Sequence, residues 1–337
     1  MKSIFARWFS RVPARVTFTP TQWVWSRGLA LLCDYNGGID SVRNQRGGEQ
    51  ALRLDPSAYH GILDGDLVWV RLTALPQFVD EVLPGIRARF VLVSGDEDWS
   101  IPGDFPGAAQ LAAHPNLLGW FTQNYDGTER SGRIQPLPIG LDFHTISNGA
   151  RWGEPQTSPA EQELQLEKLR ARMPAADDRL LRVHADFHFN RHRMRPLGET
   201  REAVESALRA NPNVDFQARK VSRSQLWREK TRYAFVVSPH GNGLDCHRTW
   251  ESLALGNIVI VKRSPLDPLY EGLPVVIVDH WDEITRDNLE RWRHQHGART
   301  QDPSALRRLT NRYWIERMRT AGAARLAQSV HPTALPA

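Results

Sequence analysis

The stretch FVVSPHGNGLDCHRTWESLALGNIVIV, residues 235–261, places two apolar runs on either side of a glycine-rich turn and a short helical pattern. The apolar runs are rich in valine and isoleucine, which is typical of strands buried on both faces of a parallel sheet. The order strand, glycine turn, helix, strand therefore predicts one unit of an α/β sheet. Such sheets bind their ligands beyond the carboxyl ends of the strands.

Strand and helix patterns alternate along the rest of the chain as well. In the first half, strand-like runs are predicted at 29–35, 66–72, 88–95, 116–124 and 134–143. In the second half they are predicted at 180–189, 214–219, 233–239, 257–262 and 273–279, with helices at 198–210, 223–231 and 245–255 and further helices at the C-terminus. A polar segment from 149 to 168 carries glycine and proline and separates the two halves. The sequence thus predicts an α/β protein of two Rossmann-like lobes facing across a cleft, residues 1–150 and 151–337.

The composition is that of a globular protein with a weak preference for anionic ligands. Hydrophobic residues make up 41% and charged residues 24% of the 337 residues, which argues against long disordered regions. Lysine and arginine exceed aspartate and glutamate by 43 to 38, and arginine suits phosphates and carboxylates. No lysine-rich block or arginine–aromatic repeat occurs, so nucleic acid is not an expected partner.

Cysteine usage and the N-terminus bear on the compartment. Only Cys33 and Cys246 occur, far apart in sequence, which favours a reducing compartment such as the cytoplasm. No apolar run has the length of a membrane span. The N-terminal stretch MKSIFARWFSRVPARVTF is basic and aromatic, and it is expected either to form a first helix or strand or to contact an anionic membrane surface peripherally.

The glycine-rich turn predicts an anion site. Gly241 and Gly243 allow a tight turn that no side chain blocks, and a helix is expected to begin near Asp245, with its free amides and positive dipole end facing the pocket. One turn further, Glu251 can accept hydrogen bonds from the two hydroxyls of a ribose, or else form a surface pair with Arg248. The donor-binding residues predicted here are His240, Gly241, Asn242, Gly243, Asp245, His247, Arg248 and Glu251.

The segment SPHGNGLDCHRTWESLALGNIVIV resembles the C-terminal signature of exostosin-like glycosyltransferases, and the likeness covers residues 233–280. A weaker likeness to bacterial and viral relatives extends to GWFTQNYDG and PLPIGLDFHT in the first half. By this resemblance Gly241 and Gly243 match the diphosphate loop, Arg248 the phosphate-facing arginine and Glu251 the ribose-binding carboxylate. Two positions depart from the family pattern, because His240 replaces a frequent arginine and Val259 a usual proline.

The resemblance implies a GT-B fold and the transfer of a sugar from a nucleotide donor, expected to be UDP, to a glycan or lipid-linked acceptor. The donor would bind in the lobe 151–337 and the acceptor in the lobe 1–150. The reaction is expected to invert the anomeric centre and to need no metal or other cofactor. A non-catalytic sugar-binding protein with the same fold is an open alternative.

Polar residues within and after the strand-like run at 180–189 allow two interpretations. Asp186 and His188 are expected to meet the sugar or the pyrophosphate, and one of Arg191, Arg193 and Arg195 the donor phosphates. Alternatively, His184, Asp186 and His188 share one face of a strand and could hold zinc or another divalent ion, which would make the protein a metal-dependent phosphoesterase or hydrolase.

The catalytic base is sought in the first lobe. Displacement with inversion needs a carboxylate or histidine within reach of the acceptor hydroxyl. Asp98, which follows a buried strand in VLVSGDEDW, is the first candidate, and Asp142 and His144 in GLDFHT are the second. Each of these residues could instead only cap a loop or a turn.

Overall fold

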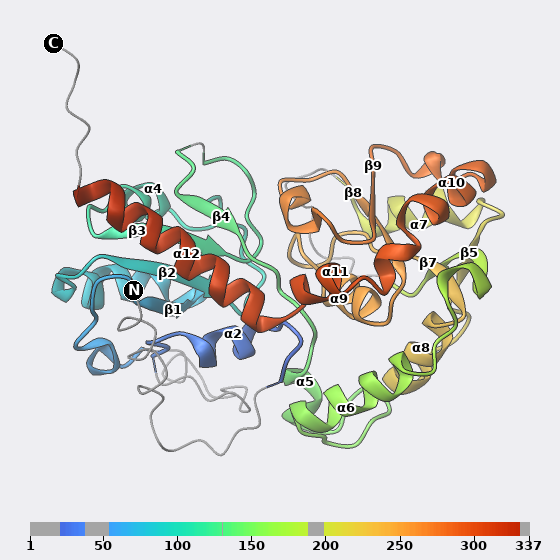
Figure 1. Ribbon diagram of the computed structural model, residues 1–337, viewed down its shortest axis with the longest axis horizontal. Helices are drawn as coiled ribbons and strands as arrows, with labels where there is room; N and C mark the ends of the chain where they lie inside the picture. The colour runs from blue at the N-terminus through green and yellow to red at the C-terminus, as the bar shows by residue number, and fades with distance from the viewer. Residues whose placement is uncertain (1–20, 38–53, 130, 188–198, 331–337) are drawn as a thin grey trace, which may run out of the picture.

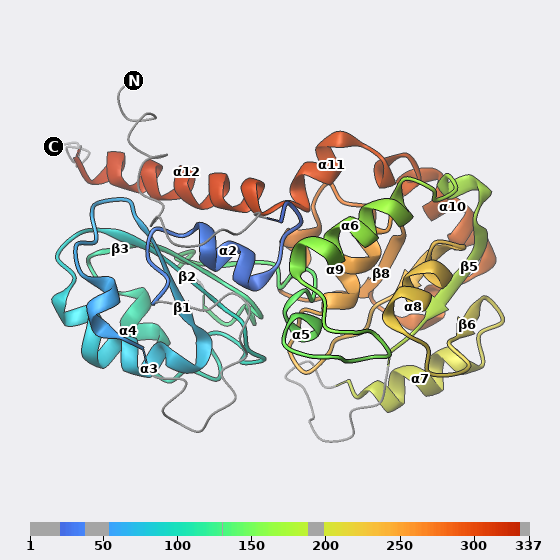
Figure 2. The same ribbon diagram turned by 90° about the horizontal axis from the view of Figure 1, so that it is seen from below.

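Two parallel β-sheets organise the chain, and the two lobes built around them lie side by side (Figure 1; Figure 2). The computed structural model describes residues 21–37, 54–129, 131–187 and 199–330. The prediction of an α/β protein with two Rossmann-like lobes is confirmed. The N-terminal stretch predicted to contact a membrane lies outside the described residues.

The first sheet has the strand order β1-β2-β3-β4, with every neighbouring pair parallel. Its strands are β1 Leu67–Arg71, β2 Phe90–Gly95, β3 Leu117–Thr122 and β4 Ile134–Pro136. Every residue of β2 and β3 is buried, as expected for central strands covered on both faces. Because the strands are parallel, their carboxyl ends meet at one edge, next to the second lobe.

The second sheet has the order β6-β5-β7-β8-β9, again entirely parallel. Its strands are β5 Leu180–Ala185, β6 Val214–Phe216, β7 Tyr233–Val237, β8 Ile258–Lys262 and β9 Val275–Val278. The order reverses direction around β5 and β7, and such a switch point is where α/β sheets bind ligands. All five predicted strands of this half are present.

Helices connect and cover the strands. The longer ones are α6 Pro159–Arg170, α7 Arg201–Arg209, α8 Arg223–Lys230, α9 His247–Ala254, α10 Arg286–His296 and α12 Asn311–Val330. Serine side chains cap the N-termini of α6 and α8 in capping boxes, which fix where these helices begin. Shorter helices include α2 Ser26–Leu32, α3 Leu75–Gln77, α4 Ala108–Ala112, α5 His144–Ser147 and α11 Pro303–Arg308.

Two strand predictions in the first half are wrong. The run 29–35 is not a strand: most of it belongs to the helix α2, in which Leu29 and Ala30 are fully buried. Leucine and alanine favour helices, and a short apolar run does not distinguish a buried helix from a buried strand. In the run 134–143 the strand ends at Pro136, since Pro136 and Pro138 lack the backbone N–H that a strand needs.

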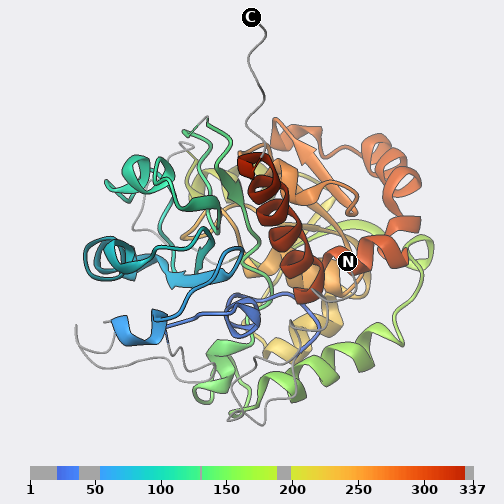
Figure 3. The same ribbon diagram turned by 60° about the vertical axis from the view of Figure 1, so that its left-hand side comes forward.

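The last helix returns to the first lobe. Helix α12 contacts β2, β3 and α2, and its Met318 is fully buried in the core shared with Val91 (Figure 3). At the point of return Asn311 donates a side-chain hydrogen bond to Trp23 O at 3.0 Å and its backbone N–H donates to Gln22 O at 2.9 Å. The boundary at residue 150 stays a prediction, but the expectation that all C-terminal helices belong to the second lobe does not hold for α12.

Within the described part of the chain, no helix combines the length and the apolar character that crossing a bilayer demands.

Candidate functional site

A cavity of about 1380 Å³ lies where the two lobes meet. The first lobe contributes Asp98, Ile139 and Asp142, and the second lobe supplies most of the remaining lining. All the basic side chains of the lining come from the second lobe: Arg201, Arg219, Lys220, Arg223, Lys230 and Arg248. A cavity of this size can hold a nucleotide with an attached sugar, and its basic wall favours an anionic ligand.

The glycine loop lies in this cavity wall, between β7 and α9. A Cβ atom added to Gly241 would lie 2.6 Å from Cys246 Sγ, and one added to Gly243 would lie 2.5 Å from Asn124 Oδ1. A side chain at either position would therefore displace a neighbouring side chain, and Gly243 is packed against the first lobe. Gly241, Asn242 and Gly243 all line the cavity, as predicted for a loop that a ligand approaches.

The prediction that the loop amides are free is wrong for part of the loop. Gly241 N donates to Gly243 O at 3.0 Å, and Asp245 N donates to Asn124 Oδ1 at 2.9 Å. Helix α9 begins at His247 rather than near Asp245, after Cys246, whose side chain makes no cap hydrogen bond. The helix end that faces the cavity is thus formed by His247 and Arg248, both of which line it.

Asp245 joins the two lobes. Its Oδ2 accepts a hydrogen bond from Ile139 N at 2.8 Å, and Trp250 Nε1 donates to the same carboxylate at 2.8 and 2.9 Å. Burial raises the pKa of Asp245 to about 6, although these hydrogen bonds act in the opposite direction. The carboxylate of Asp245 thus already has structural partners, and its contact with the donor stays a prediction.

A buried ion-pair network lies at the carboxyl end of β5. Asp186 contacts Lys230 Nζ at 2.8 Å and Arg248 Nε at 2.9 Å, and the side chains of Asp186 and Lys230 are at most 4% exposed. Burial alone would raise the pKa of Asp186, but the two cations outweigh it and hold this pKa far below its usual range. Lys230, at the end of α8, was not predicted, because a lysine in a charged helix has the pattern of a surface residue.

This network disfavours a metal at the predicted triad of His184, Asp186 and His188. Two cations already neutralise the Asp186 carboxylate, so a third, divalent charge there would be repelled. His184 is buried next to Gln217, with Nε2 3.1 Å from Gln217 Oε1. His188 lies outside the described residues, as do Arg191, Arg193 and Arg195.

Glu251 is held at the cavity from the second turn of α9. Its carboxylate accepts a hydrogen bond from Trp227 Nε1 at 3.3 Å, and the residue is 8% exposed. The Arg223 guanidinium lies 4.5 Å from the Trp227 ring centroid and donates to Asp142 O at 2.7 Å. A surface pair between Glu251 and Arg248 is not what the structure shows, since Arg248 pairs with Asp186. Trp227 and Arg223 were missed, because nothing local marks them.

The loop after β2 presents Asp98 to the cavity. Its neighbour Asp96 has a positive φ of 66° and is buried, with Arg27 at 3.3 Å and Arg71 at 3.5 Å from its Oδ2. Arg71 also contacts Glu97 at 2.7 Å. These pairs fix the backbone of the loop, so Asp98 is placed at the cavity as predicted.

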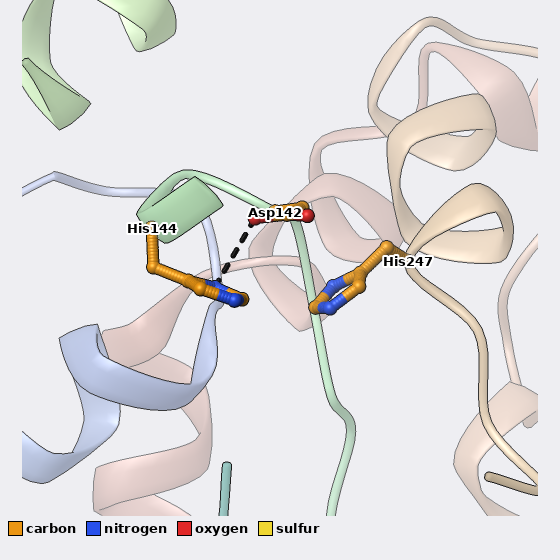
Figure 4. Close-up of side chains that lie close together, drawn as sticks. All are labelled: Asp142, His144 and His247. Carbon is orange, nitrogen blue, oxygen red and sulfur yellow. Dashed lines mark ion pairs between the residues drawn. The ribbon is translucent and has the colours of Figure 1, made fainter. Parts of the chain in front are cut away.

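Asp142 and His144 meet His247 from the opposite lobe (Figure 4). Asp142 Oδ1 lies 3.1 Å from His144 Nδ1, and the Asp142 carboxylate accepts two hydrogen bonds from Thr145. Burial would raise the pKa of Asp142, but the histidines and Thr145 bring it down to about 2. Burial lowers the pKa of His144. Asp142 is therefore a weaker base than an ordinary carboxylate.

Known proteins provide only distant comparisons. No protein-family model matches the chain, and no curated protein matches it in sequence. Among solved structures, α,α-trehalose-6-phosphate synthase from Burkholderia multivorans is similar over 83% of this chain and 76% of its own, with 14% identity and a TM-score of 0.42. The UDP-forming synthase from Burkholderia xenovorans is similar over 82% of this chain and 77% of its own, with 12% identity and a TM-score of 0.42. The Escherichia coli enzyme bound to UDP-2-fluoro glucose is similar over 80% of this chain and 73% of its own, with 11% identity and a TM-score of 0.35. Scores and identities this low establish neither a family nor an activity for this chain.

Proposed function

We propose that the protein is a glycosyltransferase of the GT-B type that transfers a sugar from a UDP-sugar to a glycan or lipid-linked acceptor. The observation that carries this proposal is the wall of the cavity formed by α9. It combines the glycine loop, the positive end of a helix, Arg248 and Lys230, and it places the carboxylate of Glu251 one turn further along. A nucleoside diphosphate needs this combination, namely donors for its phosphates and an acceptor for its ribose hydroxyls.

The donor diphosphate is assigned to the N-terminus of α9. His247 and Arg248 begin this helix. Asp186 and the backbone carbonyl of Pro239 orient the Arg248 guanidinium, whose remaining N–H groups are assigned to the leaving phosphate. Lys230 adds a fixed positive charge behind it. Preorganised positive groups of this kind stabilise the charge that develops on the leaving diphosphate. Further contacts are proposed from His240 and Asn242 in the loop.

The acceptor is assigned to the first-lobe side of the cavity, with Asp98 as the base. Asp98 lines the cavity opposite the basic wall, and the Asp96 ion pairs hold its loop in place. Direct displacement by the deprotonated acceptor hydroxyl would invert the anomeric centre without a metal, because arginines and helix amides neutralise the leaving group. Asp142 and His144 are the alternative base. The reaction is proposed to occur in the cytoplasm, where UDP-sugars and the inner membrane surface are both accessible.

The donor proposal is tested by ligand binding. UDP and UDP-sugars should raise the melting temperature more than other nucleotides, since a ligand that binds the folded state stabilises it. In calorimetry Glu251→Gln should weaken UDP binding by about 1–3 kcal/mol, the effect of removing a charged hydrogen-bond acceptor. Glu290→Gln, on the exposed face of α10, is the matched control and should bind UDP like the wild type. Unchanged affinity in Glu251→Gln would remove the ribose assignment.

The base is tested by separating turnover from binding. Asp98→Asn should lower the transfer rate by about 10²–10⁴-fold while UDP affinity stays intact. Full turnover in this variant would move the assignment to Asp142 and His144. UDP binding with no turnover from any donor would instead indicate a non-catalytic sugar-binding protein, and activity that depends on stoichiometric metal would indicate a hydrolase.

A further inference from the structure

Three potential metal ligands from two lobes converge at the cavity. Asp142 and His144 follow β4 in the first lobe, and His247 is the first residue of α9 in the second lobe. One ligand atom from each residue can be chosen so that all three lie within 4.8 Å of one another. Figure 4 shows the imidazole rings of His144 and His247 directed toward each other, with Asp142 between the two histidines. Two histidines and one carboxylate make up a common ligand set for zinc and related divalent ions.

The hydrogen bonding of His247 leaves its outer nitrogen available. Nδ1 of His247 lies 2.8 Å from Gly140 O, and since a carbonyl only accepts, Nδ1 carries the proton. The neutral ring then has its lone pair on Nε2. Histidines that bind metals typically donate their other N–H to a backbone carbonyl or a carboxylate, which fixes the ring orientation. His247 already has this outer contact.

The first-lobe ligands are held in the same way. Thr145 donates to both carboxylate oxygens of Asp142, from its backbone N at 2.9 Å and from its hydroxyl at 2.8 Å. His144 Nδ1 lies 3.1 Å from Asp142 Oδ1, yet this buried nitrogen makes no hydrogen bond with any described residue. A divalent cation bound to both atoms would satisfy this nitrogen and the carboxylate together.

We propose that Asp142, His144 and His247 form a binding site for a zinc-class divalent cation that links the two lobes. Ligand atoms of a tetrahedral zinc site lie about 3.3 Å apart, so the cluster needs to contract by about 1.5 Å at most. Three protein ligands leave a fourth position open to the cavity, which Asp142 and His247 both line. The Arg223 guanidinium donates to the backbone carbonyl of Asp142 rather than to its carboxylate.

The bound ion would act as a clamp. It would connect the start of α9 to the segment after β4, in addition to the contact between Asp245 and Ile139. Opening of the lobes would then require a metal–ligand bond to break. If the proposed transferase function holds, saturating zinc should slow turnover, since donor entry and product release need an open cleft.

Direct binding to the full-length, metal-free protein tests the site. Calorimetric titration with Zn²⁺ should give one saturable site per chain, and Co²⁺ should give the visible absorption of a tetrahedral complex. His247→Ala and His144→Ala should each lower zinc affinity by at least about tenfold. His294→Ala, on the exposed face of α10, is the control and should bind like the wild type. His247→Gln, which keeps the side-chain volume, serves if the alanine variant fails to fold.

The outcomes separate this inference from the proposed function. The site is overturned if no stoichiometric zinc binding occurs, or if zinc binds equally well to the His144 and His247 variants, whether or not the wild type binds UDP. Zinc binding that is lost in both variants supports the site even if UDP fails to bind. Zinc should also raise the melting temperature of the wild type and of His294→Ala, but not that of His247→Ala.

Discussion

Both lobes contain a buried aspartate that is paired with two basic side chains, but the basic side chains line the cavity in only one lobe. In each, a buried aspartate directly follows a central parallel strand and is held by two basic side chains: Asp96 after β2 by Arg27 and Arg71, and Asp186 after β5 by Lys230 and Arg248. The side chains of both aspartates are at most 4% exposed. In the first lobe neither basic partner lines the cavity, whereas in the second lobe both do.

This difference separates ion pairs that only stabilise the fold from ion pairs that also hold cations at the cavity. The pairs of Asp96 lie within the first lobe and hold the loop that carries Asp98. The pairs of Asp186 hold two cations that both line the cavity. A buried ion pair by itself is weak evidence for stability, so retaining cations at a cavity is better explained by ligand binding.

The largest expected effect comes from removing either carboxylate. Asp186→Asn and Asp96→Asn should each lower the free energy of unfolding by about 3–5 kcal/mol, because each removes the carboxylate that pairs with a buried cation, Lys230 in one case and Arg27 in the other. Urea unfolding measures this. The two variants should differ in UDP binding, which only Asp186→Asn should weaken. Equal UDP affinities would end the distinction between the two networks.

Removing one basic partner sharpens the comparison. Arg248→Gln should reduce UDP affinity by about 1.5–3 kcal/mol, which is the contribution of a hydrogen bond to a charged group. Arg71→Gln, the matched change in the first lobe, should leave UDP affinity unchanged. Calorimetry on both variants decides the question, and a loss of affinity in Arg71→Gln would show that the first-lobe network also serves the donor.

Acid unfolding should reveal the Asp186 network. The pKa of Asp186 is lowered from 3.8 in the folded protein, so its stabilising effect is present above pH 3.8 and is lost as the pH falls further. Below that value the folded state should lose up to about 1.4 kcal/mol per pH unit through this group. The slope of unfolding free energy between pH 5 and 3 should be flatter in Asp186→Asn, and an unchanged slope would contradict the assignment.

The smallest effect on the unfolding free energy is expected for an exposed ion pair of β5, the strand that precedes Asp186. Arg182, on β5, pairs with Asp215, but both side chains are more than one third exposed. Arg182→Gln should change the unfolding free energy by less than about 1 kcal/mol, since solvent screens such pairs. Thermal melts of Arg182→Gln and of the wild type at low and high salt measure this change in stability. A loss comparable to that of Asp186→Asn would mean that burial does not explain the difference.

Much of the fold was predictable because strands buried on both faces have continuous apolar sequences. All five strands of the second sheet and β1, β2 and β3 of the first follow from this pattern. The run 29–35 failed, because leucine and alanine pack equally well in a buried helix such as α2. The return of α12 to the first lobe depends on contacts such as Asn311 with Trp23, far apart in sequence, which no local pattern contains.

The candidate site was predictable where a local motif marks it. Gly241, Gly243, Arg248 and Glu251 belong to one strand–turn–helix unit, and all four line the cavity. Lys230, Arg223 and Trp227 come from α8, where charge and helical spacing are typical of a surface helix. The proximity of His247 to Asp142 was equally hidden, because only the docking of the lobes brings them together.

The crossing of α12 restricts how this molecule can be dissected or recombined. A fragment ending near residue 150 would lack the helix whose Met318 and Gly322 pack on β2 and β3, exposing apolar surface to solvent. A fragment that starts there would carry the same helix with nothing to cover. Chimeras that exchange the second lobe with that of another chain should therefore join at two points, one in the segment after β4 and one at residue 310, so that α12 stays with the first sheet.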